Sequence, residues 1–279
     1  MSAAGITALA QPPSRQMSEG LRIAHVHPES LGWELDPALQ VDWFAMRQPF
    51  FPPHPHAGFS AVTYMLPESA GGFVNRDSRG DRSLIRPGAL HWTEAAAGIL
   101  HEEVPEHPGV QCDGLQIFMN LPAVHKNAEP RIYHVEPEAV PVVQQAGTAV
   151  RVLAGRLGDT PPAIVPRTDC VLWDVTLDAG AQLHLPVEAQ WRLTGLVTAG
   201  GLLGDEGPAP AGSAVRLGAG LQIALRAGPA RTRLVLLGGT PLNEPIAVSG
   251  PFVMNTQVQL QAAQARYRAG AMGTLERSF

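Results

Sequence analysis

The sequence predicts an all-β protein made of two tandem β-barrels and a short C-terminal helix. Short apolar segments alternate with turn signals along nearly the whole chain, and helical periodicity is almost absent between them. Glycine and proline supply 29 and 26 of the 279 residues and are spread throughout, as frequent turns between short strands require. A worn internal repeat favours two barrels, because His54 precedes Gly88 by the same 34 residues that separate His184 from Gly218.

The predicted elements follow one another from the first residues onward. Residues 1–20 have the composition of a flexible tail, and residues 21–27 alternate as a first strand. The first barrel is assigned to residues 21–136 and the second to residues 137–255, because proline and polar residues cluster at this boundary. Further strands are expected at residues 61–66, 83–85, 114–120, 131–135, 149–153, 170–177, 193–197, 221–225 and 233–237.

One helix is expected in the C-terminal segment, residues 256–279. Thr256 can cap its N-terminus, Gln259 stands three residues later, and Gly270 follows its last turn. Its apolar stripe consists of Leu260, Ala263 and Tyr267. We expect this stripe to pack against a barrel.

Composition limits the classes of partner. The net charge of -5 provides no basic field that would attract nucleic acid or anionic lipid, so neither is expected as a direct partner. The two cysteines, Cys112 and Cys170, have no metal or redox spacing and fit a reducing cytoplasm. The first residues lack the features of a secretory signal, and no apolar run approaches the about 20 residues that span a bilayer.

Two pairs of metal-competent side chains predict a metal centre in the first barrel. His54 and His56 form one pair, and His101 and Glu103 form the other, each at a spacing of i and i+2. In a strand this spacing places both side chains on one face, so two neighbouring strands would bring three imidazoles and one carboxylate together. Alternation sends Glu102 to the opposite face. The second barrel has no such pairs around His184 and is expected to be metal-free.

The remaining histidines are assigned to other roles. His25 and His27 repeat the i, i+2 spacing but have no matching second pair, so they are expected to be structural or solvent-facing. Packing or surface positions are expected for His91, His107, His125 and His134, with His107 near the mouth of the site.

The donor set indicates an open transition-metal site. Imidazole and carboxylate together suit iron, manganese, cobalt, nickel, copper or zinc, and the absence of thiolate argues against a closed structural zinc site. Four protein ligands on an octahedral metal leave two positions for a substrate or dioxygen.

The sequence resembles the pirin family of the cupin superfamily from about Leu21 almost to the C-terminus. The motifs that match are Pro53-His54-Pro55-His56-x-Gly58-Phe59, Val62-Thr63-Tyr64, Arg86-Pro87-Gly88, Gly98-Ile99-Leu100-His101-x-Glu103, Gly114-Leu115-Gln116, Asn120-Leu121-Pro122 and Gly250-Pro251-Phe252-Val253-Met254-Asn255-Thr256.

The resemblance implies two cupin barrels, with a degenerate second one. It also implies a metal, Fe(II) first, on His54, His56, His101 and Glu103. Some bacterial pirins resemble quercetin 2,3-dioxygenases, which open the flavonol ring with dioxygen and release carbon monoxide, whereas others resemble redox-responsive regulators.

The sequence departs from the family pattern beside these ligands. The usual His-Arg-Gly-Phe-Glu run becomes His56-Ala57-Gly58-Phe59-Ser60, and Ala97 replaces an arginine before Gly98. Two guanidiniums and one carboxylate are therefore lost from the surroundings of the metal, where such groups tune ligand orientation and acidity. Metal binding is expected to survive, whereas the choice of substrate stays open.

The leading functional hypothesis is a cytoplasmic metal-dependent dioxygenase that uses dioxygen and a small aromatic substrate, a flavonol or a related aromatic enol. Glu103 would complete the metal shell and, if it swings away from the metal, act as the catalytic base that takes the substrate's hydroxyl proton. The alternative is a non-enzymatic regulator whose metal oxidation state is read by a protein partner. A metal that only stabilises the barrel is a third hypothesis. The native metal, the native substrate and self-association stay open at this point.

Overall fold

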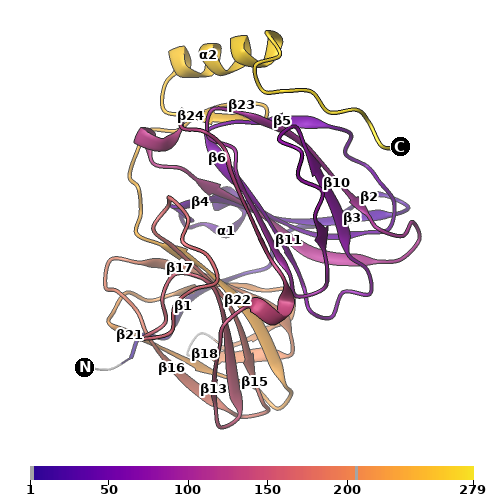
Figure 1. Ribbon diagram of the computed structural model, residues 1–279. Helices are drawn as coiled ribbons and strands as arrows, with labels where there is room; N and C mark the ends of the chain where they lie inside the picture. Colours follow the sequence, from indigo (N-terminus) through magenta and orange to yellow (C-terminus); the bar gives the residue numbers. More distant parts are fainter. Residues whose placement is uncertain (1–2, 205–206) are drawn as a thin grey trace. The chain divides into compact units, whose positions relative to one another are not determined.

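The computed structural model describes residues 3–204 and 207–279 (Figure 1). Strands dominate this part of the chain, which confirms the predicted all-β class. Its helical segments are α1 (Pro28–Leu31), α2 (Gln257–Arg268) and two 3-10 turns, η1 (Ala123–His125) and η2 (Pro137–Ala139). Each of the strands predicted from residues 61–66 to residues 233–237 overlaps an observed strand.

The chain forms two compact units that are not contiguous in sequence. One unit, which we call the histidine unit, comprises Ser14–His25, Gln40–Glu138 and Asn243–Phe279. The second unit comprises the described residues up to Pro13, together with Val26–Leu39 and Ala139–Leu242. The units therefore do not follow a linear division at residues 136 and 137. The described residues up to Pro13 belong to the second unit, and Asn243–Phe279 belongs to the histidine unit.

The prediction of a flexible tail at residues 1–20 is wrong for most of that segment. Ile6–Ala10 forms strand β1 and pairs with residues 214–217, and Ser14–Ser18 forms strand β2 and pairs with residues 21–24. The backbone gains these ladder hydrogen bonds without a strong apolar pattern, so the segment looks like a tail in the sequence. Met1 and Ser2 of the predicted tail, and residues 205–206 of the predicted second barrel, lie outside the described residues.

The histidine unit is built from two antiparallel sheets. The larger sheet has the order β12 (Arg131–Val135), β9 (Leu90–Glu94), β6 (Phe59–Met65), β11 (Cys112–Asn120), β4 (Ala38–Met46), β3 (Leu21–Val26) and β2. The smaller sheet has the order β5 (His54–His56), β10 (Ile99–Pro105), β7 (Phe73–Asp77) and β8 (Leu84–Ile85). Side chains of both sheets line one cavity, so the sheets face each other across it as the walls of an open barrel.

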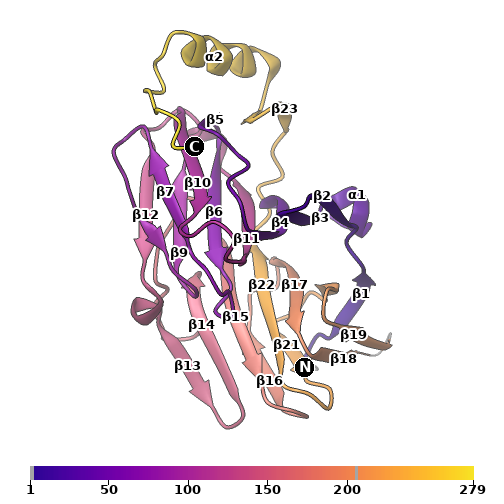
Figure 2. The same cartoon turned by 90° about the vertical axis from the view of Figure 1, so that its right-hand side faces the viewer.

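The second unit consists of one seven-stranded sheet and two hairpins. Its main sheet has the order β1, β20 (Ala214–Leu217), β17 (Arg192–Ala199), β22 (Thr232–Gly239), β15 (Cys170–Leu177), β14 (Thr148–Ala154) and β13 (Val142–Gln145), and Figure 2 shows β14, β15 and β22 side by side. The hairpins are β16 (Gln182–Pro186) with β21 (Gln222–Arg226), and β18 (Gly201–Gly204) with β19 (Gly207–Pro210). Buried apolar side chains, Trp173 and Leu236 among them, form its core.

Within the histidine unit, the C-terminal segment packs against Ala57 and Leu100. β23 (Ala247–Ser249) and β24 (Phe252–Met254) form a hairpin beside α2 (Figure 1). Thr256 caps α2 through the predicted reciprocal hydrogen bonds with Gln259. Leu260 and Ala263 are buried as predicted, but Tyr267 is 42% exposed because the stripe turns outward near the end of the helix. Over the part of the chain described, no helix has both the length and the hydropathy needed to cross a membrane.

Candidate metal centre

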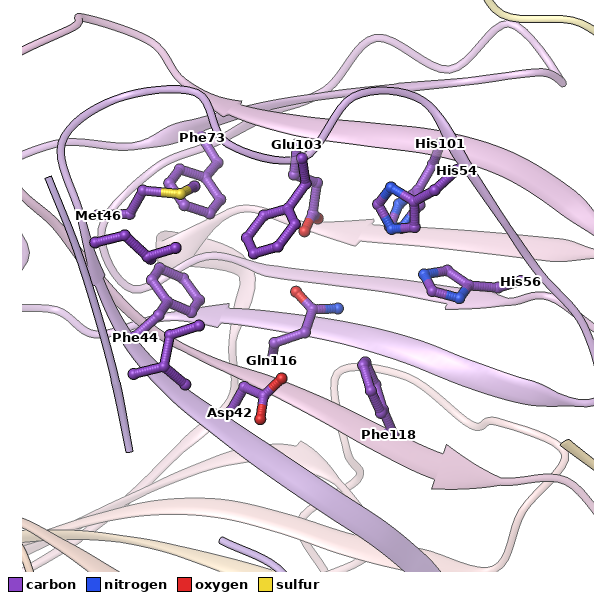
Figure 3. Close-up of a pocket in the computed structure, with 13 residues that line it drawn as sticks. Asp42, Phe44, Met46, His54, His56, Phe73, His101, Glu103, Gln116 and Phe118 are labelled. Carbon is purple, nitrogen blue, oxygen red and sulfur yellow. The ribbon is translucent and has the colours of Figure 1, made fainter. Parts of the chain in front are cut away.

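Strands β5 and β10 bring three histidines together. The two strands pair in antiparallel register with His101 directly opposite His54, so the predicted neighbouring strands are observed. One ligand atom from each of His54, His56 and His101 lies within 4.8 Å of the others, and the ring centroids are 4.7 to 4.8 Å apart. Figure 3 shows the three rings at one end of a cavity. Strand alternation accounts for His54 and His56 sharing this face.

Hydrogen bonds fix the tautomers of two of these rings. His54 Nδ1 lies 2.9 Å from the carbonyl oxygen of Pro52, which can only accept, so Nδ1 holds the proton and the Nε2 lone pair is free. His101 Nδ1 lies 3.4 Å from Asn75 Oδ1, and the Asn75 amide nitrogen donates to Asp81 at 2.8 Å. The Asn75 oxygen is therefore the acceptor for His101, which again leaves Nε2 free for a metal.

The imidazoles are neutral bases at physiological pH. Burial, followed by the proximity of His54, lowers the pKa of His56 to about 3. Burial and the neighbouring histidines also lower the pKa of His101, and burial lowers that of His54. The buried Nδ1 of His56 forms no well-aligned hydrogen bond. Three clustered, neutral imidazoles with available lone pairs have the donor chemistry that divalent transition metals require.

Glu103 lines the same cavity but lies outside the group of three. It belongs to β10, two residues after His101, and its carboxylate oxygens lie 2.6 and 2.8 Å from the hydroxyl of Thr63. Burial raises the pKa of Glu103 to about 7, against the hydrogen bond from Thr63, which lowers it. Three of the four predicted ligands, the histidines, thus lie together. The fourth, Glu103, lines the same cavity and accepts a hydrogen bond from the Thr63 hydroxyl instead.

Thr63 and Gln116 extend this polar wall. They face each other in register on β6 and β11, and the Thr63 hydroxyl lies 2.8 Å from Gln116 Oε1. Sequence reasoning assigned neither residue nor Asn75 to the site. Thr63 and Gln116 both belong to motifs that match the pirin family, and this match is the feature of the sequence that could have indicated their place in the site.

Glu102 points away from the cavity, as strand alternation predicts. It is fully buried and pairs with Arg76, which stands opposite it on β7. Arg76 also donates to the carbonyl of Glu276 at 3.1 Å. This pair therefore ties the outer face of β10 to the C-terminal segment.

The other histidines have contacts of their own. His25 Nδ1 lies 2.7 Å from Asp42 Oδ1, and His27 caps the N-terminus of α1. His91 is buried with its Nδ1 3.4 Å from that of His134. The side chain of His107 is 72% exposed and does not line the cavity, so the expected place at its mouth is not observed.

The cavity is mostly apolar and has a volume of about 120 Å³. An apolar cavity of about 150 Å³ can hold benzene, so this one encloses about one aromatic ring. Phe51 lines it and is 45% exposed, which places Phe51 at the opening. Over residues 3–204 and 207–279, no lysine or arginine lines the cavity. The lining residues are Leu21, Ile23, Asp42, Phe44, Met46, Phe51, His54, His56, Phe73, His101, Glu103, Gln116 and Phe118.

The positions that depart from the family pattern lie in closely packed surroundings. Ala57 is buried in an apolar cluster with side chains of β24 and α2. Ser60 is fully buried, and its hydroxyl has no hydrogen-bond partner among the described residues. The carbonyl of Ala97 accepts a hydrogen bond from Arg266 of α2 at 3.0 Å. Because the side chains at these positions are small, residues of the C-terminal segment can pack closely against this part of the chain.

Comparisons with known proteins agree with this architecture. The Pirin family model matches residues 12–119, and the model of the pirin C-terminal cupin domain matches residues 172–273. A pirin-like protein of Solanum lycopersicum is 37% identical over 88% of this chain and 84% of its own length. Human pirin is 34% identical over 93% of this chain and 91% of its own.

A solved structure shows the same fold. The crystal structure of quercetin 2,3-dioxygenase from Acinetobacter baumannii superimposes with a TM-score of 0.86 at 26% identity, covering 99% of this chain and 100% of that one. Two cupin domains, the ordered sequence motifs and relatives that match over nearly their whole length all lead to one assignment: the chain belongs to the pirin family.

Proposed function

We propose that this protein is a metal-dependent dioxygenase that acts on a flavonol or a related aromatic enol. The observation that carries the proposal is the cluster of three neutral imidazoles at one end of an apolar, ring-sized cavity that also contains Glu103. The similarity in fold to the quercetin 2,3-dioxygenase from Acinetobacter baumannii supports this class of reaction. In this proposal the metal ligands are His54, His56, His101 and Glu103.

The donor set fits a divalent transition metal. Three imidazole nitrogens and one carboxylate suit Fe(II) first, and also manganese, cobalt, nickel, copper or zinc. Such a metal, when bound, supplies Lewis acidity for an enolate oxygen and, if redox-active, a means of using dioxygen.

The residues around the cavity prepare the substrate. When it is released from the metal, the carboxylate of Glu103 would take the enol hydroxyl proton; in the metal-free protein, burial raises its pKa to about 7. Thr63 orients that carboxylate. Phe118, whose ring centroid lies 6.1 Å from that of His56, would supply an apolar wall for the ring that bears the enol, and the rest of a flavonol would extend past Phe51 at the opening.

Metal affinity is expected to depend on pH through Glu103. Below pH 7 this carboxyl is largely protonated, and a metal must displace the proton, so affinity should fall about tenfold for each pH unit from 7 down to 5. His56 and His101 contribute little over this range because burial lowers their pKa values far below it. Competition titrations with a chromogenic chelator and zinc(II), which is redox-inert, would measure the slope.

Glu103→Gln provides the control for this pH dependence. This variant should bind zinc more weakly and with a smaller pH dependence over the same range. A slope equal to that of the wild type would show that Glu103 is not a ligand. Without metal, Glu103 binds more protons in the folded than in the unfolded state between pH 4.5 and about 7, whereas the buried histidines, whose pKa values are lowered, bind fewer. Because several histidines oppose one carboxyl, the stability of the metal-free protein should rise as the pH rises from about 4.5 to 6.5.

Turnover of quercetin tests the proposed function directly. Iron-loaded wild-type protein should consume oxygen and release carbon monoxide with quercetin, whereas His56→Ala, treated identically, should give only background signals. Equal background signals from both proteins would overturn the proposal and would favour a regulatory role. Partner capture that differs between ferrous and ferric protein would then test that alternative.

A further inference from the structure

A second carboxylate lines the cavity away from the histidines. Asp42 lies on β4 of the larger sheet, whereas the three histidines lie on the smaller sheet. In Figure 3, Asp42 stands beyond Gln116, on the side of the cavity away from His54 and His101. The cavity therefore has two carboxylates, Glu103 and, on the other side of Gln116, Asp42.

His25 holds this second carboxylate in place. Its Nδ1 lies 2.7 Å from Asp42 Oδ1, and the side chains of His25 and Asp42 are 42% and 22% exposed. The other oxygen, Oδ2, accepts no hydrogen bond from the residues that the structure describes. Burial raises the pKa of Asp42, with the His25 hydrogen bond acting against it. A partly desolvated carboxylate of this kind gains from a hydroxyl donor on a ligand.

We propose that Asp42, positioned by His25, binds a second hydroxyl group of the substrate, away from the enol at the metal. This inference rests on the proposed function and narrows the substrate class to aromatic enols with at least two hydroxyl groups. Among the described residues, none that lines the cavity is a lysine or arginine that could bind an anionic group. The charged acceptors there are carboxylates, so the matching ligand supplies hydrogen-bond donors.

The competing explanation is an ordinary ion pair near the surface. Such pairs contribute little to stability, and a structural pair would affect all substrates alike. A site that binds a substrate hydroxyl instead discriminates against the analogue that lacks it. The two explanations therefore differ in substrate preference rather than in overall activity.

The test compares quercetin with 3-hydroxyflavone, which retains the enol but lacks the other hydroxyl groups. For iron-loaded protein, the ratio of kcat/KM for quercetin to that for 3-hydroxyflavone should fall about 10- to 100-fold in Asp42→Asn, as expected for a lost hydrogen bond to a charged group. The loss should appear mainly in KM, because the contact is present in both ground and transition states. His25→Ala should lower the same ratio, and it should add nothing in the double variant with Asp42→Asn.

Asp113→Asn is the matched control. Asp113 lies on β11 of the same sheet, accepts hydrogen bonds from Gln111 at 2.9 Å and does not line the cavity. Its substitution removes the same charge and should leave the substrate ratio unchanged.

Binding without turnover separates the two proposals. If wild-type protein turns over neither flavonol, the proposed function fails, and anaerobic fluorescence titration of the iron-loaded protein with the same two compounds still measures the ratio as Kd values. A ratio that falls in Asp42→Asn supports the assignment of Asp42 by either readout. A ratio that is unchanged in Asp42→Asn overturns it.

Discussion

Replacement of His101 by alanine is expected to abolish specific metal binding and, with it, oxygen consumption. His101 is buried on β10, opposite His54, and it supplies one of the three clustered ligand atoms. Removing an outer-shell partner of a metal ligand typically costs about 10- to 100-fold in affinity or activity, and removing the ligand itself should cost more. Metal content after iron loading and desalting, measured beside the rate of oxygen consumption, would show the loss.

His107→Ala is the control for this substitution. His107 is exposed and does not line the cavity, so its loss should leave both metal content and oxygen consumption at wild-type levels. Thermal unfolding of both metal-free variants would verify that they fold. A folded His101→Ala protein that retains stoichiometric iron would contradict the assignment of the metal to this cluster.

Replacement of Lys126 by methionine is expected to lower the free energy of unfolding of the histidine unit by about 3–5 kcal/mol. Lys126 is the only lysine in the sequence and is fully buried. Its Nζ donates to Gly58 O at 2.6 Å, Asn120 Oδ1 at 2.5 Å and Val253 O at 3.1 Å. Burial lowers its pKa to about 8, so at pH 7 the amine still holds the protons that these bonds need.

The cost of this substitution arises from the acceptors that remain. Methionine fills a similar volume but leaves three buried oxygens without donors, and each costs about 1–3 kcal/mol when no water replaces the amine. Denaturant unfolding of the metal-free protein would measure the effect. Arg131→Met removes an exposed cation from β12 and should change stability by at most about 0.5 kcal/mol. Equal stabilities for the two variants would show that water satisfies the three oxygens.

Lys126 also connects distant parts of the chain beside the metal centre. Gly58 follows His56 by two residues, and a Cβ atom on Gly58 would lie 1.8 Å from the carbonyl oxygen of Val253. Gly58 has a φ of +84°, which disfavours other residues there, so glycine permits the close approach of β24 that Lys126 then fixes. As the only lysine, Lys126 also offers an amine-labelling test: its acylation should be slow in native protein and rapid after unfolding.

The sequence was most informative where local periodicity controls structure. The i, i+2 spacing placed His54 with His56 on one face and sent Glu102 away from the cavity, as observed, because side chains alternate along any strand. The capping pair Thr256 and Gln259 was equally predictable, because an N-cap depends on residues three positions apart. Turn-bounded apolar runs likewise located the predicted strands.

Prediction failed where long-range pairing decides the outcome. The composition of residues 1–20 gave no sign of β1, because that strand is stabilised by hydrogen bonds to β20, about 200 residues away along the chain. The packing of the C-terminal helix against a barrel was predicted from its apolar stripe, but its contact with Ala57 was not, because no local pattern encodes that partner. His25 offered no clue to its partner Asp42, since a short side chain on the adjacent strand determines that contact.

The sequence by itself determined the β class, the pirin resemblance, the donor types and the face of each strand on which they lie. Only the tertiary structure decided that β5 and β10 pair with His101 opposite His54, that Thr63 holds Glu103 outside the imidazole cluster, and that Asp42 lines the other side of the cavity. The physical reason is the separation along the chain between the residues that interact. Alternation is set by the backbone geometry of neighbouring residues, whereas register, hydrogen-bond partners and cavity walls depend on packing between segments far apart in the chain.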